Sequence, residues 1–194
     1  MTTAARRSSH ASQLVLWLAA VSLGASAIAA DVSVAELMRG LAARGPDRAK
    51  FVERKYLAIL DQPVVSTGEL SYTPPDRLEK KTLTPKPESL VLDKGILTLQ
   101  RDQKKLTLRL AEYPQIAAIV DSLRGMLAGD RTALEKTYRM EAYGSRERWT
   151  LVLLPSDARV AEVLQRIDVA GSGDRVRSIE IRQTDGDRSV MAIE

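Results

Sequence analysis

Few side chains in this 194-residue chain could do acid–base, nucleophilic or metal chemistry. There is no cysteine, and the one histidine, His10, stands in an N-terminal segment with the features of a cleaved leader. Without that segment, Ser-His-Asp catalysis, Cys-His catalysis and the usual zinc ligand sets are excluded. The carboxylate pairs that remain are Glu79 with Glu88, and Asp185 with Asp187. Acids beside Gly and Pro more often form turns than transfer protons, and the second pair lacks the further ligands of a calcium loop. We therefore expect no catalytic residues, no metal and no cofactor.

Regularly spaced apolar residues are the more informative group. Two sets stand out: Leu106, Leu108 and Leu110, which alternate with polar residues as on a strand, and Ile116, Ile119, Val120, Leu123 and Leu127, which recur at helical spacing. Each set is either ordinary core or the wall of a ligand cavity, and the residues alone leave both interpretations open.

Basic residues are only slightly in excess. Two of the 29 Lys and Arg residues and none of the 25 Asp and Glu residues lie in the first 29 positions, which leaves a net charge of +2 beyond them. Nucleic-acid binding needs a concentrated basic face, so none is expected. Arg77, Lys80 and Lys81 form a local cluster, which is either a solvated strand face or a docking surface for an acidic patch on a membrane partner.

Residues 1–29 have the pattern of a signal peptide for Sec export. Arg6 and Arg7 supply a positive n-region, and the apolar run Leu14–Leu23 is too short to span a bilayer. Small residues then allow cleavage after Ala29, although an uncleaved anchor helix is the alternative. Because no cysteine is available for lipidation or disulfides, we expect a soluble periplasmic protein. Residues 30–194 have the length of a single domain with one core.

Helices are expected at four places. Over residues 33–43 the apolar positions recur at helical spacing, and Ser33 with Glu36 forms a capping box. A second helix begins at Pro114 and ends before Gly129, and a short one follows over residues 132–136. Residues 157–165 are ambiguous between helix and strand, and we favour a short helical turn that leads into a strand.

Alternating apolar residues and frequent turn signals predict about ten antiparallel strands. The expected strands cover residues 49–60, 67–72, 77–83, 89–92, 96–101, 105–110, 138–143, 146–154, 163–170, 175–184 and 188–194. Hairpin turns are expected at Gly144-Ser145 and at residues 185–187. The predicted fold is α+β but mainly β: a curved antiparallel sheet or half-open barrel, with an N-terminal helix and a helical lid inserted mid-chain.

With the strands placed, one stretch resembles the LolA family of periplasmic outer-membrane lipoprotein carriers. The family pattern has a Phe-x-Gln-like strand, then Gly-x-Leu with an aromatic residue, a proline turn, and a segment of the type P-x-S-x-L-V-x-D-G. The matching elements are Phe51-Val52-Glu53, Gly68-Glu69-Leu70-Ser71-Tyr72, Pro75-Asp76-Arg77-Leu78 and the segment from Pro87 to Gly95. They occur in the family's order over about 45 residues.

The resemblance implies a half-open barrel that is lined with apolar side chains and lidded by helices. It implies a monomeric carrier that takes acylated lipid or lipoprotein cargo from an inner-membrane releasing complex to an outer-membrane acceptor. It also implies which side chains line the cavity and lid: Phe51, Leu70, Tyr72, Leu78, Leu90, Leu92, Leu97, Leu99, Leu106, Leu108, Ile116, Ile119, Val120, Leu123, Trp149 and Leu151.

Two positions depart from the family pattern. Carriers of the family have an arginine directly before the turn proline, where it ties the barrel to the lid, and this chain has Pro74 there. Arg77 or Lys80 could take over that latch or serve in docking. The glutamine of the first strand is replaced by Glu53. We interpret the chain as a divergent member whose cargo could be a glycolipid or another acyl conjugate.

A periplasmic lipid-sensing or regulatory module of the same fold is the alternative function. Such regulators usually carry a second domain, whereas this sequence ends at Glu194, directly after its last predicted strand. That favours the carrier, and an enzyme is the least favoured reading.

Overall fold

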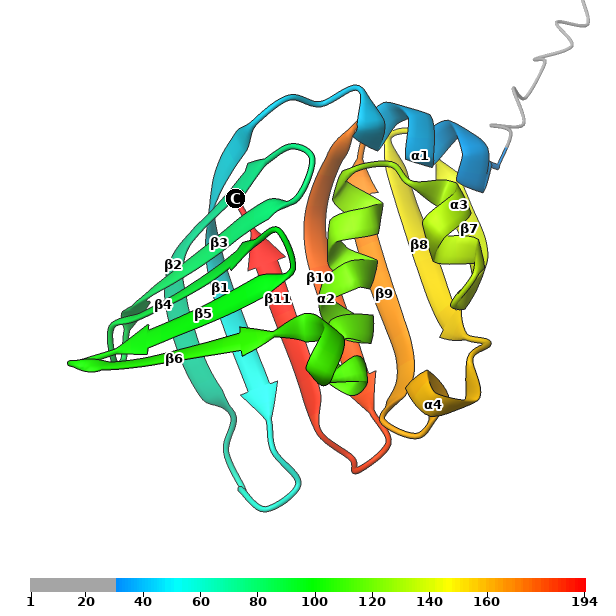
Figure 1. Cartoon of the computed structure of the whole chain (residues 1–194). Coiled ribbons are helices and arrows are strands. Elements are labelled where there is room, and N and C mark those ends of the chain that lie inside the picture. The colour runs from blue at the N-terminus through cyan, green and yellow to red at the C-terminus, as the bar shows by residue number, and fades with distance from the viewer. Residues whose placement is uncertain (1–30) are drawn as a thin grey trace, which may run out of the picture.

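In the computed structural model, which describes residues 31–194, one antiparallel sheet curves around a long helix (Figure 1). The sheet has 11 strands in the order β6-β5-β4-β3-β2-β1-β11-β10-β9-β8-β7. Because β6 and β7 are edges that do not pair with each other, the sheet stays open, which confirms the predicted half-open, mainly β fold. The predicted leader lies outside the described residues.

The elements follow the predicted order closely. The strands are β1 Asp47–Tyr56, β2 Val64–Thr73, β3 Arg77–Thr84, β4 Glu88–Asp93, β5 Ile96–Arg101, β6 Lys104–Arg109, β7 Tyr138–Ser145, β8 Arg148–Pro155, β9 Leu164–Ser172, β10 Arg175–Gln183 and β11 Arg188–Ile193. The helices are α1 Val34–Ala42, α2 Pro114–Leu127, α3 Arg131–Glu135 and α4 Ala158–Ala161, with a 3₁₀ turn over Leu110–Glu112 before α2.

Several predicted boundaries differ: β2 begins at Val64 instead of Thr67, and Leu110 lies in the 3₁₀ turn instead of the strand before it. The first strand ends at Tyr56 instead of Leu60, because its ladder with β11 runs out at the pair Tyr56 and Arg188. The apolar residues that follow form a loop, in which the Ile59 side chain is 89% exposed. The β7–β8 turn lies at residues 146–147 instead of 144–145, because Gly144 pairs with Trp149 within the ladder.

Side-chain caps fix the helices as the sequence predicts. Ser33 Oγ accepts a hydrogen bond from the Glu36 amide at 3.2 Å, and Glu36 Oε2 accepts one from the Ser33 amide at 2.9 Å. This is the expected capping box of α1. Asp157 caps α4 by accepting from the Arg159 amide at 2.9 Å, and β9 begins at Leu164. The short helical turn that leads into a strand is therefore confirmed.

Two apolar cores lie on the concave face of the sheet, on either side of a seam. The larger packs β7–β10 against α1 and α2 and contains Trp149, Leu151 and Ile167, all almost fully buried. The smaller consists of Leu92, Leu97 and Leu110, with neighbours that include Val120 of α2. Since α2 contributes to both cores, this helix bridges the two halves of the concave face.

Candidate apolar cavity

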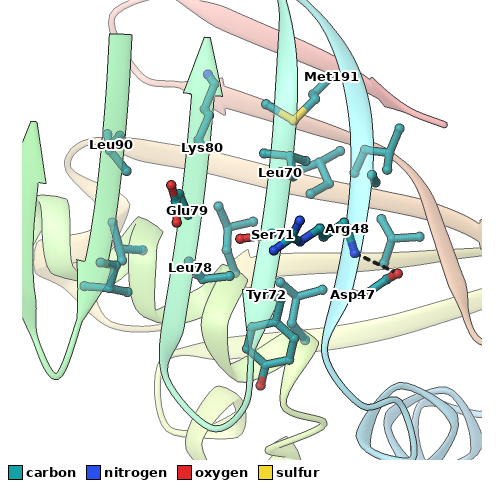
Figure 2. A pocket seen from close by; sticks show the side chains of 18 of the residues that line it. Asp47, Arg48, Leu70, Ser71, Tyr72, Leu78, Glu79, Lys80, Leu90 and Met191 are labelled. Atoms are coloured by element: carbon teal, nitrogen blue, oxygen red, sulfur yellow. Dashed lines mark hydrogen bonds between the residues drawn. The ribbon is translucent and has the colours of Figure 1, made fainter. Parts of the chain in front are cut away.

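A cavity of about 230 Å³ lies at this seam, between α2 and the central strands of the sheet (Figure 2). Its walls come from β1, β2, β3, β4, β10 and β11, from α1 and α2, and from the segment that joins α1 to β1. Figure 2 shows Tyr72 and Asp47 toward one end of the view, and Lys80 and Met191 toward the other.

Strand register explains why the wall is apolar. Tyr72, Leu78 and Leu92 are direct neighbours across β2, β3 and β4, and Leu70, Lys80 and Leu90 form the next such row on the same face. On the other side of the seam, β10 and β11 present Ile179 and Met191, which are also paired. Leu123 and Leu127 of α2 close the wall from above, and every residue named here lines the cavity.

About half of the predicted cavity residues meet in this lining. These are Leu70, Tyr72, Leu78, Leu90, Leu92, Val120 and Leu123, and the predicted latch residue Lys80 joins them. They come from three strands and from α2, which are the elements that carry the family resemblance and the helical stripe.

The other predicted residues lie elsewhere in the fold. Trp149 and Leu151 are buried in the larger core, where the Trp149 indole N–H donates to the Gly173 carbonyl at 2.9 Å. Leu97 and Leu108 belong to the smaller core. Leu106 and Ile116 are 52% and 39% exposed. The remaining three residues do not line the cavity. The Phe51 ring packs against Gly68, Leu99 pairs with the lining residue Leu90, and Ile119 packs against the larger core.

The sequence prediction missed the contribution of the C-terminal hairpin. Ile179, Ile181, Met191 and Ile193 all line the cavity. Their alternation along the last two strands marks them as one face of a sheet, but only the β1–β11 pairing brings that face beside β2 and β3. The family resemblance covered only the first half of the chain and gave no hint of this.

Charged residues lie at both ends of the cavity: Arg44 and Asp47 form an ion pair at one end, and Glu53 of β1 organises the polar cluster at the Lys80 end. The Glu53 side chain is 6% exposed and forms an ion pair with Lys80 of β3. Glu53 Oε1 accepts from Ser189 Oγ of β11 at 2.7 Å. Glu53 Oε2, the oxygen that pairs with Lys80, also lies 3.4 Å from Ser66 Oγ of β2. Burial alone would raise the pKa of the Glu53 carboxyl, but the Lys80 ammonium, the Lys55 ammonium and the Ser189 hydroxyl together outweigh it and leave that pKa lowered.

The two candidate latch residues are both held by partners on the sheet. Arg77 bridges Asp93 at 2.9 Å and Glu79 at 3.5 Å, and Lys80 pairs with Glu53. The α2 helix carries a cation of its own, Arg124. Burial raises the pKa of the Tyr72 hydroxyl, and the positive charge of Arg124 opposes that rise.

The carboxylate pairs noted in the sequence do not form acid–base sites. Glu79 is opposite Val91 and Glu88 is opposite Thr82, so the two are not neighbours in the ladder. Asp185 accepts from the Asp187 amide at 3.0 Å within the β10–β11 turn, and Asp187 accepts from the Ala58 amide at 2.8 Å, which joins that turn to the β1–β2 loop. Within residues 31–194 no three His, Cys, Asp or Glu side chains gather as a metal site would require.

A curved open sheet that holds a helix over an apolar cavity defines a lidded, half-open barrel. The family model described as outer membrane lipoprotein carrier protein LolA-like matches residues 25–192. The chain therefore belongs to the LolA-like family, which confirms the resemblance seen in the sequence.

Solved structures match the chain at low sequence identity and with TM-scores below 0.5. The LolA superfamily protein of Nitrosomonas europaea is 10% identical with a TM-score of 0.46, and the match covers 84% of this chain and 92% of that one. The Pseudomonas aeruginosa MucA/MucB complex gives 12% identity, a TM-score of 0.45, and coverage of 84% and 56%. A Vibrio parahaemolyticus domain described as an outer membrane lipoprotein-sorting protein domain is 10% identical with a TM-score of 0.45, and the match covers 83% of this chain and 88% of that one. No curated protein matches the chain.

Proposed function

We propose that this protein is a periplasmic carrier that binds the acyl chains of a lipoprotein or other lipid conjugate in the seam cavity. The observation that carries the proposal is the cavity itself, where leucines of β2, β3 and β4 face isoleucines of β10 and leucines of α2. Each CH₂ group that leaves water for such a wall gains about 0.8 kcal/mol. Membership in the LolA-like family supports the same function.

The size of the cavity argues for a lid that moves. An engineered apolar cavity of about 150 Å³ already holds benzene, whereas pockets for larger ligands span about 300–1,000 Å³. At about 230 Å³ this cavity has room for part of an acyl chain. A whole chain requires α2 to move away from β2–β4. Closing of the lid then competes with the cargo, which keeps release reversible.

Export and transfer belong to the same proposal. Residues 1–29 would direct Sec export and be removed after Ala29, which leaves residues 30–194 as one lipid-carrier domain. The cargo would come from an inner-membrane releasing complex and pass to an outer-membrane acceptor, without any chemical step. Within residues 31–194, no helix combines the length and apolar character needed to cross a bilayer.

The test is acyl binding by the purified mature protein. We expect an environment-sensitive fluorescent acyl probe to bind, and mass spectrometry of an organic extract to reveal co-purified acyl species. Absence of both would exclude the carrier. Binding without any transfer of acylated cargo between donor and acceptor vesicles would instead favour a lipid-sensing regulatory module.

A pair of matched substitutions assigns the binding to this cavity. Leu70→Asp puts a carboxylate into the wall, so we expect probe affinity to fall at least about tenfold, since a buried unpaired charge is strongly unfavourable. Leu106→Asp is the control, because Leu106 lies on the same face but is 52% exposed and outside the lining. Equal loss in the two variants, with both folded by circular dichroism, would place binding elsewhere.

A further inference from the structure

At the Lys80 end of the cavity, the ion pair of Glu53 with Lys80 lies on an otherwise apolar face of the sheet. Glu53 and Lys80 both line the cavity, although every cross-strand neighbour of Lys80 on that face is a leucine. Replacing such a pair by apolar residues is often neutral or stabilising, so a pair that faces a cavity is a candidate for recognition of a ligand.

The hydrogen-bonding capacity of this pair is used unequally. Both Glu53 oxygens have partners: Oε1 accepts from Ser189, and Oε2 accepts from Lys80 and Ser66. The Lys80 ammonium has three N–H groups, and across residues 31–194 Glu53 is its only hydrogen-bond acceptor. The nitrogen also lies 5.0 Å from the centroid of the Phe51 ring, a cation–π contact. The Lys80 ammonium therefore has N–H groups left to donate to a ligand. The ionised Glu53 carboxylate can only accept hydrogen bonds, and both of its oxygens already do so.

Charge balance limits what that donor can take. A carboxylate ligand at Lys80 would lie beside the buried Glu53 carboxylate, and like charges repel strongly where water is scarce. Lys55 adds a second cation 3.9 Å from Glu53, but its side chain is 50% exposed, so water screens it. A neutral carbonyl oxygen accepts a hydrogen bond from Lys80 without adding charge.

From this geometry we infer that the Glu53–Lys80 pair selects acyl groups joined by an ester or amide bond over free fatty acids. Lys80 donates to the carbonyl oxygen of the linkage while the alkyl chain lies along the leucine wall. Glu53 is the specificity-determining residue, because it neutralises the ammonium that would otherwise attract a free carboxylate. The inference rests on the proposed acyl binding.

The experiment compares methyl laurate with laurate at a pH of about 8, where the free acid is ionised. Their dissociation constants are measured by displacement of the fluorescent acyl probe. For the unaltered protein we expect the ester to bind at least about tenfold more tightly, the size of one charge-assisted hydrogen bond or its loss. Binding of neither compound would contradict the proposed function, whereas equal binding would contradict only the selection.

Glu53→Gln should reverse the preference, because it leaves the Lys80 ammonium without its counter-charge. We expect laurate to gain at least about tenfold in affinity, while methyl laurate changes little. Lys55→Met is the matched control, since it removes the exposed cation near the same carboxylate and should leave the preference unchanged. An unaltered ratio in Glu53→Gln overturns the inference.

A second variant keeps the inference testable if Glu53→Gln does not fold. Glu53→Gln/Lys80→Met removes both charges and leaves no buried cation unpaired. Without the Lys80 donor, methyl laurate should bind about tenfold more weakly than to the unaltered protein. Undiminished ester binding by this double variant would overturn the role of Lys80.

Discussion

The stability of the sheet should depend on pH through the Glu53 carboxyl. The Glu53 carboxylate joins β1 to β3 through Lys80 and to β11 through Ser189, so it must stay ionised to hold three strands together. Its pKa is lowered from the usual 4.5. A lowered carboxyl pKa stabilises the folded state above the unfolded value, and this stabilisation is lost as the pH falls through the folded value. The loss is therefore expected below pH 4.5.

Glu53→Gln should accordingly cost about 3 kcal/mol in the free energy of unfolding at neutral pH, because it leaves the Lys80 ammonium, whose side chain is 22% exposed, without its counter-charge. The difference from the unaltered protein should shrink as the pH falls below 4.5. Urea unfolding at a series of pH values measures it. Glu79→Gln removes a carboxylate with a 35% exposed side chain, 3.5 Å from Arg77, and serves as control. It should cost under about 1 kcal/mol. A constant difference across the acid range would rule out ionised Glu53 as the cause.

The contact between Glu53 and Lys80 could not be predicted from the residue types alone. The sequence identifies Glu53 as a departure from the family glutamine and Lys80 as one of several strand cations. That the two meet depends on register, because Glu53 pairs with Ser66 and Met191 in its two ladders while Lys80 pairs with Leu70. Lys81, one residue further on, pairs instead with Glu69. Strand alternation places Lys80, and not Lys81, on the face of Leu78, but only the register of β1, β2 and β3 shows that Glu53 lies beside it.

Among the elements, α2 is tied firmly at its C-terminal end. Ser122 is buried and shares a hydrogen bond of 3.0 Å with the Tyr138 hydroxyl of β7, which fixes the helix to the larger core. After the helix ends, Gly129 has φ of 65° and meets α1. A Cβ there would come within 2.4 Å of both Ala42 Cβ and the Met38 carbonyl oxygen. The Tyr138 hydroxyl also donates to the Ala118 carbonyl at 3.1 Å, so these contacts anchor α2 from its first half to its C-terminal end.

Gly129→Ala should loosen this attachment. It forces a left-handed conformation on alanine and pushes α1 away from the end of α2, so we expect a loss of about 3 kcal/mol or more in the free energy of unfolding. Gly173→Ala isolates the conformational effect, because Gly173 has φ of 60° but open space around its Cα. That control should cost about 1 kcal/mol. Thermal unfolding measures both, and equal losses would show that the contact with α1 contributes nothing.

Element prediction succeeded at helix starts that carry a local chemical signal, although the Gly144-Ser145 turn signal was misleading because both residues pair within the ladder. The Ser33 capping box and Pro114 at the start of α2 each specify a helix start within a few residues. It failed at Leu57–Leu60, where an apolar run suggested that the strand continues. There the limit is set by partner strands, since β2 begins only at Val64 and its ladder with β1 starts at Lys55.

At the scale of the molecule, the sheet carries two cores of unequal size. The larger joins α1, α2 and four strands, whereas the smaller contains three buried leucines, and β6 beyond it is an edge. The cavity lies between them. The predicted single curved sheet is correct, but the sequence could not locate the cavity, because alternating leucines look alike in a core and at a seam. Of the strand leucines, Leu92 lines the cavity while Leu97, its direct neighbour on β5, does not.

This asymmetry predicts how the molecule opens. Local stability follows the number of buried apolar contacts, so β8 and β9 should exchange their amide hydrogens most slowly and β5 and β6 much faster. Binding of an acyl ester stabilises only the state that it occupies. It should therefore add protection to α2 and to β2–β4, and little to β8 and β9, which are already protected by the larger core. Hydrogen–deuterium exchange measured by mass spectrometry with and without methyl laurate tests this. Protection that rises equally over all strands would mean that the sheet opens as one unit, and the seam would then not be the route by which cargo enters.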